Sequence, residues 1–381
     1  MGVGKLHFWG EHNRPLSPEE RTHRLPVPAS TEIPSDLEAS MAEYRIYVST
    51  PGKEQRPAVD TLVHNHLGSR SIWELSITQS ENQQLVHLPI ESIVREDPEL
   101  IRSAIDPAAD FTGFCPDWSH LFYLPRTLPS TSETHLTRFN GQRVEPAYVF
   151  GADNRQVYRD TSFPWRCVGK VFNSDGKVGS GALVGSNVMV TAGHMIPWNG
   201  ANGGGWIRFV PDYFDTQSLL GSGVQSYVSD VRGYSDSYYS GQPSGYDWAI
   251  CKLNNPLGNS VGYFGFNGYD SNWEDLNVWD VAGYPTAVAG GNRPSWQGGI
   301  AILDDDSDSN DGDELESNNA DITGGNSGGP IFAWFNKDPR VIGVVSGWAS
   351  EYIFPKGTED DNIFASGSGF TNLIAWGRSN W

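Results

Sequence analysis

Histidine, cysteine and positive charge are all scarce in this sequence. Residues 136–381 contain a single histidine, His194, so this half of the chain has one imidazole for use as a base or a metal ligand. The three cysteines do not have the spacing of a zinc site, which argues against a tetrahedral Cys/His shell. We therefore expect neither a metal nor an organic cofactor.

The charge balance and the apolar pattern exclude further classes of protein. The chain has 26 Lys and Arg against 46 Asp and Glu, a formal net charge of −20. A surface of this sign repels phosphate backbones and anionic lipids, so we expect no nucleic acid and no membrane as partner. There is no uninterrupted apolar run of about 18 residues. The abundant residues, 43 glycines and 14 tryptophans, are typical of a turn-rich β protein with an aromatic core.

Three short segments carry residues that are suited to acyl transfer. His194 closes the apolar string 188–194, and Asp247 stands at the start of the apolar run 246–250. Ser327 lies within a glycine-rich turn, residues 324–330. A base, an acid and an exposed serine are what nucleophilic catalysis at a carbonyl requires.

The order of these residues along the chain separates the possible hydrolase folds. The α/β-hydrolases place their histidine after the serine, and no histidine follows Ser327. A papain-like pair needs a histidine after its cysteine, whereas Cys251 has none and Cys167 has only the nearby His194. The order His, Asp, Ser remains.

In that order the three segments resemble the catalytic motifs of chymotrypsin-like serine proteases. The matching strings are Thr-Ala-Gly-His (191–194), Asp-Trp-Ala-Ile (247–250) and Gly-Asn-Ser-Gly-Gly-Pro (325–330). The resemblance implies an all-β fold of two six-stranded antiparallel Greek-key β-barrels followed by a C-terminal helix. It also implies a serine endopeptidase with His194 as base, Asp247 as its orienting acid and Ser327 as nucleophile. The backbone N–H groups of Gly325 and Ser327 would form the oxyanion hole.

Further features resemble the bacterial branch that includes the staphylococcal glutamyl endopeptidase. They are Asn326 before the serine, the absence of a cysteine beside His194, and the entry segment 149–155 followed by Pro-Trp-Arg at 164–166. The resemblance covers residues 146–381. It implies a secreted, monomeric enzyme made as a zymogen and acting on protein or peptide substrates, although residues 1–6 lack a signal-peptide pattern.

Some positions depart from the family pattern. Animal members carry an aspartate before the serine that binds a newly freed amino terminus, and uncharged Asn326 cannot form that ion pair. Val345 stands where glutamate-specific relatives have a histidine, so a glutamate preference has no cation to depend on. The string Ser-Gly-Trp (346–348) inverts the usual Ser-Trp-Gly order in the wall of the specificity pocket.

Ser346 and Asp321 are the predicted substrate-binding residues. Asp321 lies six residues before Ser327, at the position that forms the base of the primary pocket in trypsin-like relatives. A buried carboxylate there would select Lys or Arg. Two alternatives stay open: Asp321 can simply bond to backbone, as in bacterial relatives, or Trp348 can narrow the pocket and favour small residues.

Composition divides the chain into three zones. Residues 1–40 are rich in proline and charge and are predicted to be disordered or loosely attached. Residues 41–145 are predicted to form a pro-region or accessory segment, with a helical stretch at 91–105 and a linker at 125–132. Residues 146–381 are the predicted protease domain. The acidic run 304–316, with eight acids, is predicted to be a solvated hairpin loop rather than a metal site.

Two questions remain open from the sequence. Cys115, Cys167 and Cys251 allow either one disulfide, with Cys167 and Cys251 as candidate partners, or three buried thiols. The second hypothesis for function is a catalytically silent relative that uses its pocket only for binding. An intact triad and oxyanion turn favour the active enzyme.

Overall fold

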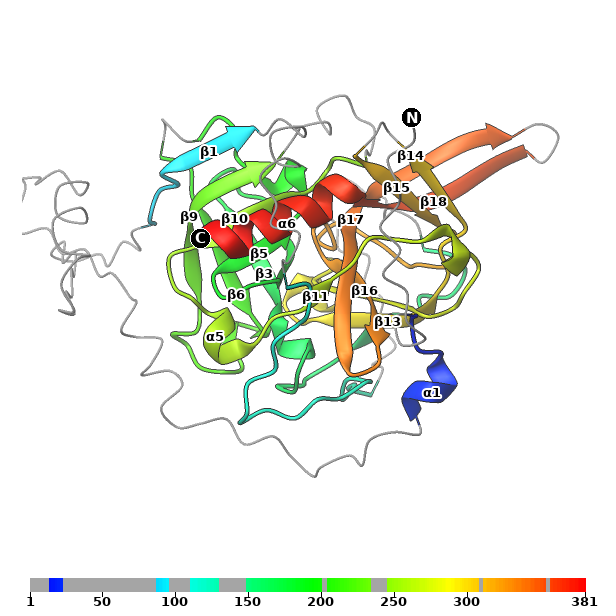
Figure 1. The fold of residues 1–381 in the computed structure, drawn as a ribbon, viewed down its shortest axis with the longest axis horizontal. Helices are drawn as coiled ribbons and strands as arrows, with labels where there is room; N and C mark the ends of the chain where they lie inside the picture. The colour runs from blue at the N-terminus through cyan, green and yellow to red at the C-terminus, as the bar shows by residue number, and fades with distance from the viewer. Residues whose placement is uncertain are drawn as a thin grey trace, which may run out of the picture.

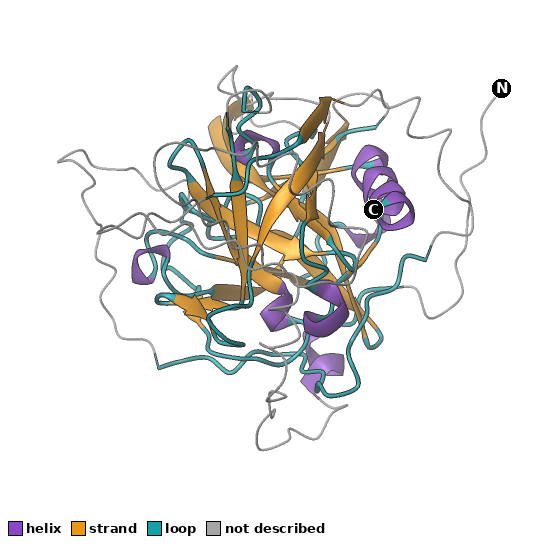
Figure 2. Cartoon of the chain, turned by 90° about the vertical axis from the view of Figure 1, so that its left-hand side faces the viewer, coloured by secondary structure: helices purple, strands orange, loops and turns teal. Residues whose placement is uncertain are grey.

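The computed structural model describes residues 14–22, 87–95, 110–129, 149–200, 204–233, 245–307, 311–353 and 357–381. Most of residues 1–40 and 41–145, and with them most of the predictions for those two zones, lie outside the described residues. Within the described part, strands dominate and helices are few (Figure 2).

Six antiparallel strands close into the first barrel (Figure 1). Their order is β6-β3-β4-β5-β10-β9, and an additional pairing between β9 and β6 closes the ring. All four residues of β5 are buried, because this strand lies within the barrel wall beneath the C-terminal helix. The strands are β3 (Val168–Asn173), β4 (Val178–Leu183), β5 (Val188–Thr191), β6 (Ile207–Pro211), β9 (Ser226–Gly233) and β10 (Ala249–Leu253).

The second sheet has nine strands, seven of which follow one antiparallel path. Its order is β14-β15-β18-β17-β16-β12-β13. Because β13 runs through residues 301–303 directly into β14, the two ends of this order are one continuous stretch of chain. The strands are β12 (Trp279–Gly283), β13 (Ser295–Ile300), β14 (Asp304–Ser307), β15 (Asp313–Ser317), β16 (Pro330–Phe335), β17 (Asp338–Ile353) and β18 (Gly357–Ser366). The predicted two-barrel fold is confirmed.

The C-terminal helix α6 (Ser368–Asn380) packs against β5 and β10 of the first barrel and against β18. This confirms the predicted terminal helix, whose Leu373 and Ile374 are buried. The short elements are α1 (Pro18–Thr22), β1 (Ser92–Arg95), β2 (Gln156–Val157), η1 (Trp165–Cys167), η2 (Gly193–Met195), β7 (Tyr213–Phe214), β8 (Gln217–Ser218), α5 (Gly258–Val261), β11 (Gly265–Phe266), η4 (Ser271–Trp273) and η5 (Ala289–Gly291). Among the described residues, no helix is long and apolar enough to cross a lipid bilayer.

Aromatic rings join the two barrels, with the buried Trp165 at the centre of the contact. Trp165, which precedes β3, contacts Trp296 of β13 and Phe332 of β16 edge-to-face, with ring centroids 5.9 and 5.7 Å apart. Because each such ring removes roughly 150–250 Å² from water, this contact stabilises the relative position of the two barrels. The candidate catalytic residues, which come from both barrels, depend on that position.

Parts of the N-terminal zone pack closely against the barrels, which differs from the expectation that residues 1–40 are loosely attached. Leu16 is buried and its N–H donates to Trp334 O, while the buried Arg21 forms an ion pair with the buried Asp280 of β12. Residues 92–95, predicted to be helical, form strand β1, which pairs in parallel with β9. Leu16, Arg21 and strand β1 of the N-terminal zone thus all have partners on the barrels.

Candidate active site

His194 lies in the short 3-10 turn η2 that follows strand β5. Two contacts hold the main chain of this turn: Asn173 Nδ2 donates to Met195 O at 2.8 Å, and Lys177 Nζ donates to His194 O at 2.9 Å. The indole of Trp198 donates to Gly193 O at 2.9 Å. The imidazole is therefore carried by a fixed backbone, and its side chain is 12% exposed.

The pairing of β5 with β10 brings Asp247 to His194. The register joins Thr191 to Ala249, so the residues just beyond these strand ends face one another. Asp247 Oδ1 accepts the backbone N–H of His194 at 2.7 Å, and Oδ2 lies 2.7 Å from His194 Nδ1. With Nδ1 engaged in this way, the other ring nitrogen, Nε2, is the one available for proton transfer.

Ser346 supports the same carboxylate. Its hydroxyl donates to Asp247 Oδ2 at 2.7 Å, and both side chains are buried. Ser346 was predicted to bind substrate. In the structure its side chain contacts the acid, and its role in binding substrate stays a prediction. No short-range pattern marks this contact, because the two residues are 99 positions apart.

The turn that carries Ser327 is clamped between the barrels. Ser180 of β4 donates its N–H to Ser327 O at 2.8 Å, and on the other side Gly328 N–H donates to Val345 O of β17 at 2.8 Å. Gly328 has φ +81° and lies against the His194 turn. A Cβ built on it would come within 2.6 Å of Ala192 N and would overlap Thr191 Oγ1. Glycine is needed here for both its φ and its size.

Within residues 325–329, two N–H groups have no acceptor among the described residues. The N–H groups of Asn326, Gly328 and Gly329 all donate within the fold. Those of Gly325 and Ser327 have no acceptor among the residues that the structure describes. The carbonyl of Gly325 accepts from the Ser180 hydroxyl at 2.7 Å, which fixes the peptide plane after Gly325. Free, fixed N–H groups of this kind can stabilise an oxyanion.

Asp321, predicted to form the base of the primary pocket, contacts the entry segment in the structure. Its side chain is buried, and its two oxygens accept the backbone N–H groups of Phe150 at 2.9 Å and Asn154 at 2.7 Å. Burial raises the pKa of the carboxyl, and the two N–H donors counteract this in part. This geometry agrees with the alternative in which Asp321 bonds to backbone, here that of the entry segment.

Arg155 contacts the same turn and was not singled out from the sequence. Its Nη1 donates to Thr323 Oγ1 at 2.8 Å and to Asn326 Oδ1 at 3.1 Å. Ser180, which holds the Gly325 carbonyl, was missed as well. An arginine just before a strand and a serine within one are common in any β protein, so no local signal distinguishes these two.

The three cysteines form no disulfide, and two of them are buried. Cys115, Cys167 and Cys251 are all free thiols, which settles the open question in favour of no disulfide. Cys167 and Cys251 are fully buried, and burial raises the pKa of both thiols strongly. Neither is suited to serve as a nucleophile, because the reactive form of cysteine is the thiolate.

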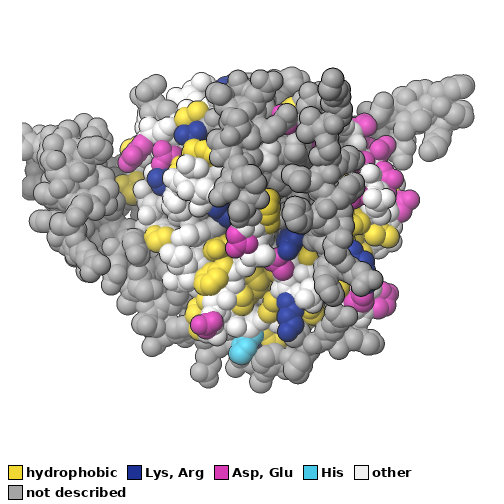
Figure 3. Space-filling model, viewed as in Figure 1, with side chains coloured by type: hydrophobic (Ala, Val, Ile, Leu, Met, Phe, Trp, Pro, Cys, Tyr) yellow, Lys and Arg dark blue, Asp and Glu magenta, His cyan; other side chains and the backbone are white. Residues whose placement is uncertain are grey.

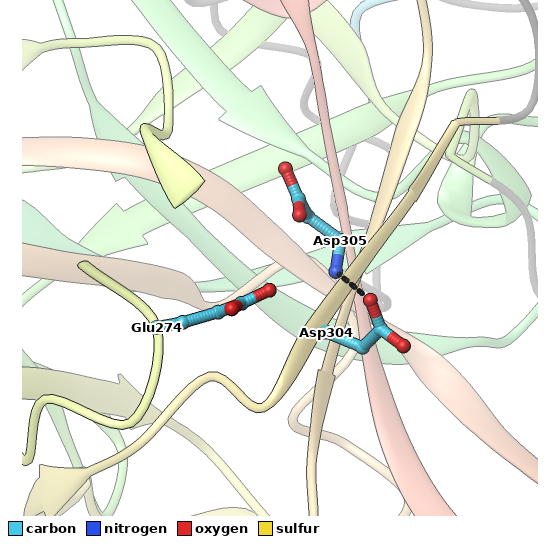
Figure 4. A group of neighbouring side chains, drawn as sticks. All are labelled: Glu274, Asp304 and Asp305. Atoms are coloured by element: carbon cyan, nitrogen blue, oxygen red, sulfur yellow. Dashed lines mark hydrogen bonds between the residues drawn. The ribbon is translucent and has the colours of Figure 1, made fainter. Parts of the chain in front are cut away.

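Residues 304–316, predicted to be a hairpin loop, include the paired strands β14 and β15, with Asp304 opposite Glu316. Acidic side chains gather at the right-hand edge of the face in Figure 3, on the side where this hairpin lies in Figure 1. Three carboxylates, those of Glu274, Asp304 and Asp305, lie within 4.8 Å of one another (Figure 4). Glu274 and Asp304 are exposed and Asp305 is partly buried.

Comparisons with known proteins identify the family. The family model described as Trypsin matches residues 153–353, more than half of the chain. A glutamyl endopeptidase from Bacillus licheniformis is 25% identical over 267 residues, covering 67% of this chain and 78% of that protein. An extracellular metalloprotease from Bacillus subtilis strain 168 is 28% identical over 159 residues, covering 40% of this chain and 49% of its own length.

Among solved structures, a Glu endopeptidase in complex with MPD is 18% identical with a TM-score of 0.47, and the match covers 61% of this chain and 100% of that one. The family match and the similarity to a glutamyl endopeptidase confirm the predicted family and its bacterial branch. The chain belongs to the Trypsin family and is a serine endopeptidase of the chymotrypsin-like fold.

Proposed function

We propose that this protein hydrolyses peptide bonds through a His194–Asp247–Ser327 triad and an acyl-enzyme intermediate. The observation that carries the proposal is the double contact of Asp247 with both the main chain and Nδ1 of His194. That arrangement fixes the tautomer and the direction of the imidazole. A residue kept only for structure would not need both contacts on a ring that lies beside a serine turn.

Each group has one role in the proposed reaction. Ser327 Oγ attacks the carbonyl carbon, and its proton passes to His194 Nε2, while Asp247 stabilises the resulting imidazolium. The tetrahedral oxyanion is bound by the N–H groups of Gly325 and Ser327, which have no acceptor among the described residues. Collapse expels the amine, which takes the proton from His194. Water then repeats the sequence and releases the acyl group from Ser327.

A covalent probe tests the proposal. A fluorophosphonate should label one serine per chain, and peptide mapping should locate the label at Ser327. A Ser327→Ala variant should neither react nor hydrolyse casein, and a p-nitrophenyl ester should give a burst that equals the concentration of wild-type sites. Labelling elsewhere, or casein hydrolysis by Ser327→Ala, would exclude the triad. A wild-type chain that does not react would favour the silent-relative hypothesis.

We further propose that residues 146–381 are the catalytic unit and that the preceding residues form an accessory arm. The contacts of Leu16, Arg21 and β1 with the barrels support an arm that stays attached. We also propose that the enzyme is a monomer and that it acts outside the cell. A relative that is named extracellular supports the location. Limited proteolysis followed by size-exclusion chromatography tests both the boundary and the oligomeric state, and assay of culture medium tests export.

A further inference from the structure

Arg155 connects the entry segment to the nucleophile turn. It directly precedes strand β2, which pairs with β13 of the second barrel, Gln156 with Trp296 and Val157 with Ser295. This pairing fixes the backbone from which the Arg155 side chain extends. The side chain is only 2% exposed, so its guanidinium depends on protein partners rather than on water.

The two sides of the guanidinium have different partners. Nε and Nη2 donate to Asp153 Oδ1 and Oδ2 at 2.9 and 2.7 Å, which is a bidentate pair. Burial alone would raise the pKa of Asp153, but the hydrogen bonds and charge of Arg155 outweigh it and hold that pKa below its ordinary value. With one side anchored to Asp153, the remaining nitrogen Nη1 is directed at Thr323 and Asn326.

These two contacts lie at both ends of the tight turn 323–326. Within the turn, Asn326 N–H donates to Thr323 O at 3.0 Å, and Thr323 N–H donates to Asn326 Oδ1 at 3.2 Å. Arg155 Nη1 reaches the Asn326 oxygen and the Thr323 hydroxyl. Asn326 is the residue between the two free N–H groups, those of Gly325 and Ser327. A rotation of either peptide would displace Asn326 from the guanidinium.

We infer that Arg155 is a positioning residue for the oxyanion site. It holds the turn in the conformation that leaves the Gly325 and Ser327 N–H groups free, and Asp153 in turn holds Arg155. In animal members of the family the positive charge beside this turn is a newly freed amino terminus. Here the charge belongs to Arg155 of the entry segment, so it is present without cleavage of the chain. This inference rests on the proposed function, because it assigns Arg155 a role in the reaction at Ser327.

Steady-state kinetics of the full-length chain on a peptide amide test the inference. Arg155→Gln removes the fork and the charge while keeping a polar side chain. Its kcat should fall about 10- to 100-fold, somewhat less than the loss of a whole oxyanion donor, with KM changed less than about threefold. The affinity for a peptide boronate, which forms a tetrahedral adduct, should fall in parallel with kcat. Arg155→Lys, which keeps the charge, should recover part of the loss.

Two further variants separate positioning from general structural damage. Arg293→Gln is the matched control, because Arg293 forms a comparable but exposed pair with Asp215; its kcat should match wild type. Asn326→Ala combined with Arg155→Gln should lose little more than the larger single effect, since both changes act on one turn. An unchanged kcat in Arg155→Gln, an equal loss of boronate and product-peptide affinity, or additive losses in the double variant would each overturn the inference. Activity in Ser327→Ala would instead refute the proposed function.

Discussion

The Ser346 hydroxyl and the Asp247 carboxylate meet at 2.7 Å although they come from different barrels. Asp247 precedes β10 of the first barrel, and Ser346 lies on β17 of the second. With the two donors of His194, this gives the buried carboxylate three hydrogen bonds. A buried charge is tolerated only when it is satisfied in this way. The Asp247 carboxylate therefore contacts the imidazole of His194 and also joins the two barrels.

The triad should behave as a single unit. We expect Ser327→Ala and His194→Ala each to reduce kcat by several orders of magnitude. Ser327 supplies the nucleophile and His194 accepts its proton, so the attack needs both residues. The double variant should lose little beyond either single change. Hydrolysis of a peptide amide, measured at matched protein concentrations with thermal melts to confirm folding, checks this. Substantial turnover by His194→Ala would contradict the assignment, since residues 136–381 have no other histidine.

Gly328 should tolerate no side chain. Gly328→Ala should abolish hydrolysis or prevent folding, since the added Cβ would overlap Thr191 Oγ1 in addition to straining φ. Gly151→Ala is the matched control, because Gly151 has φ +79° but no heavy atom within 4 Å of a built Cβ. It should cost only about 1 kcal/mol of unfolding free energy, the strain of the backbone alone. Equal effects of the two substitutions would show that packing against the His194 turn does not matter.

The buried ion pair of Arg21 and Asp280 should stabilise the attachment of the N-terminal segment. Arg21→Met should lower the unfolding free energy by about 3–5 kcal/mol, because it leaves the Asp280 carboxylate without its charged partner. Combining it with Asp280→Asn should recover part of this loss. Arg14→Met removes an exposed pair with Glu20 in the same segment and should cost less than about 1 kcal/mol. Urea unfolding measures all three, and a loss below 1 kcal/mol in Arg21→Met would mean that the segment is only loosely held.

Local sequence patterns were sufficient to predict the fold class and to identify the three candidate triad residues. The strings around His194, Asp247 and Ser327 are contiguous, so their residue types and order could be read directly. The contacts that support them are not contiguous: Ser346 to Asp247, Ser180 to Gly325 and Arg155 to Asn326 all join distant strands. Strand pairing across two barrels sets these contacts, and no short-range period encodes them. The same reason explains why β1 was mistaken for helix, since only its pairing with β9 makes it a strand.

The position of Asp321 predicts a structural role rather than control of specificity. Asp321→Asn should leave the preference for the residue before the scissile bond unchanged, because both oxygens are engaged by the entry segment. Stability should fall, since an amide supplies one acceptor oxygen in place of two. Cleavage profiling of a peptide library with wild type and variant checks this. A wild-type preference for Lys or Arg that the variant loses would support the role of Asp321 as the pocket base, as the sequence predicts.

Lys170 should make stability depend on pH in the alkaline range. Its side chain lies beside the rings of Phe172 and Tyr213, and burial, with the nearby charge of Arg208, lowers its pKa from 10.5 to about 8. Below pH 8 the folded protein carries a buried ammonium at a cost. Between pH 8 and 10.5 the folded state releases this proton while the unfolded chain retains it, so the cost declines as pH rises. Relative to Lys170→Met, the wild type should therefore gain thermal stability across this window. Lys337→Met, at an exposed position, controls for the general effect of high pH. The melting temperature of wild type minus that of Lys170→Met should rise from pH 7 to 11. A difference that stays constant or falls would show that Lys170 is charged at no cost in the folded state.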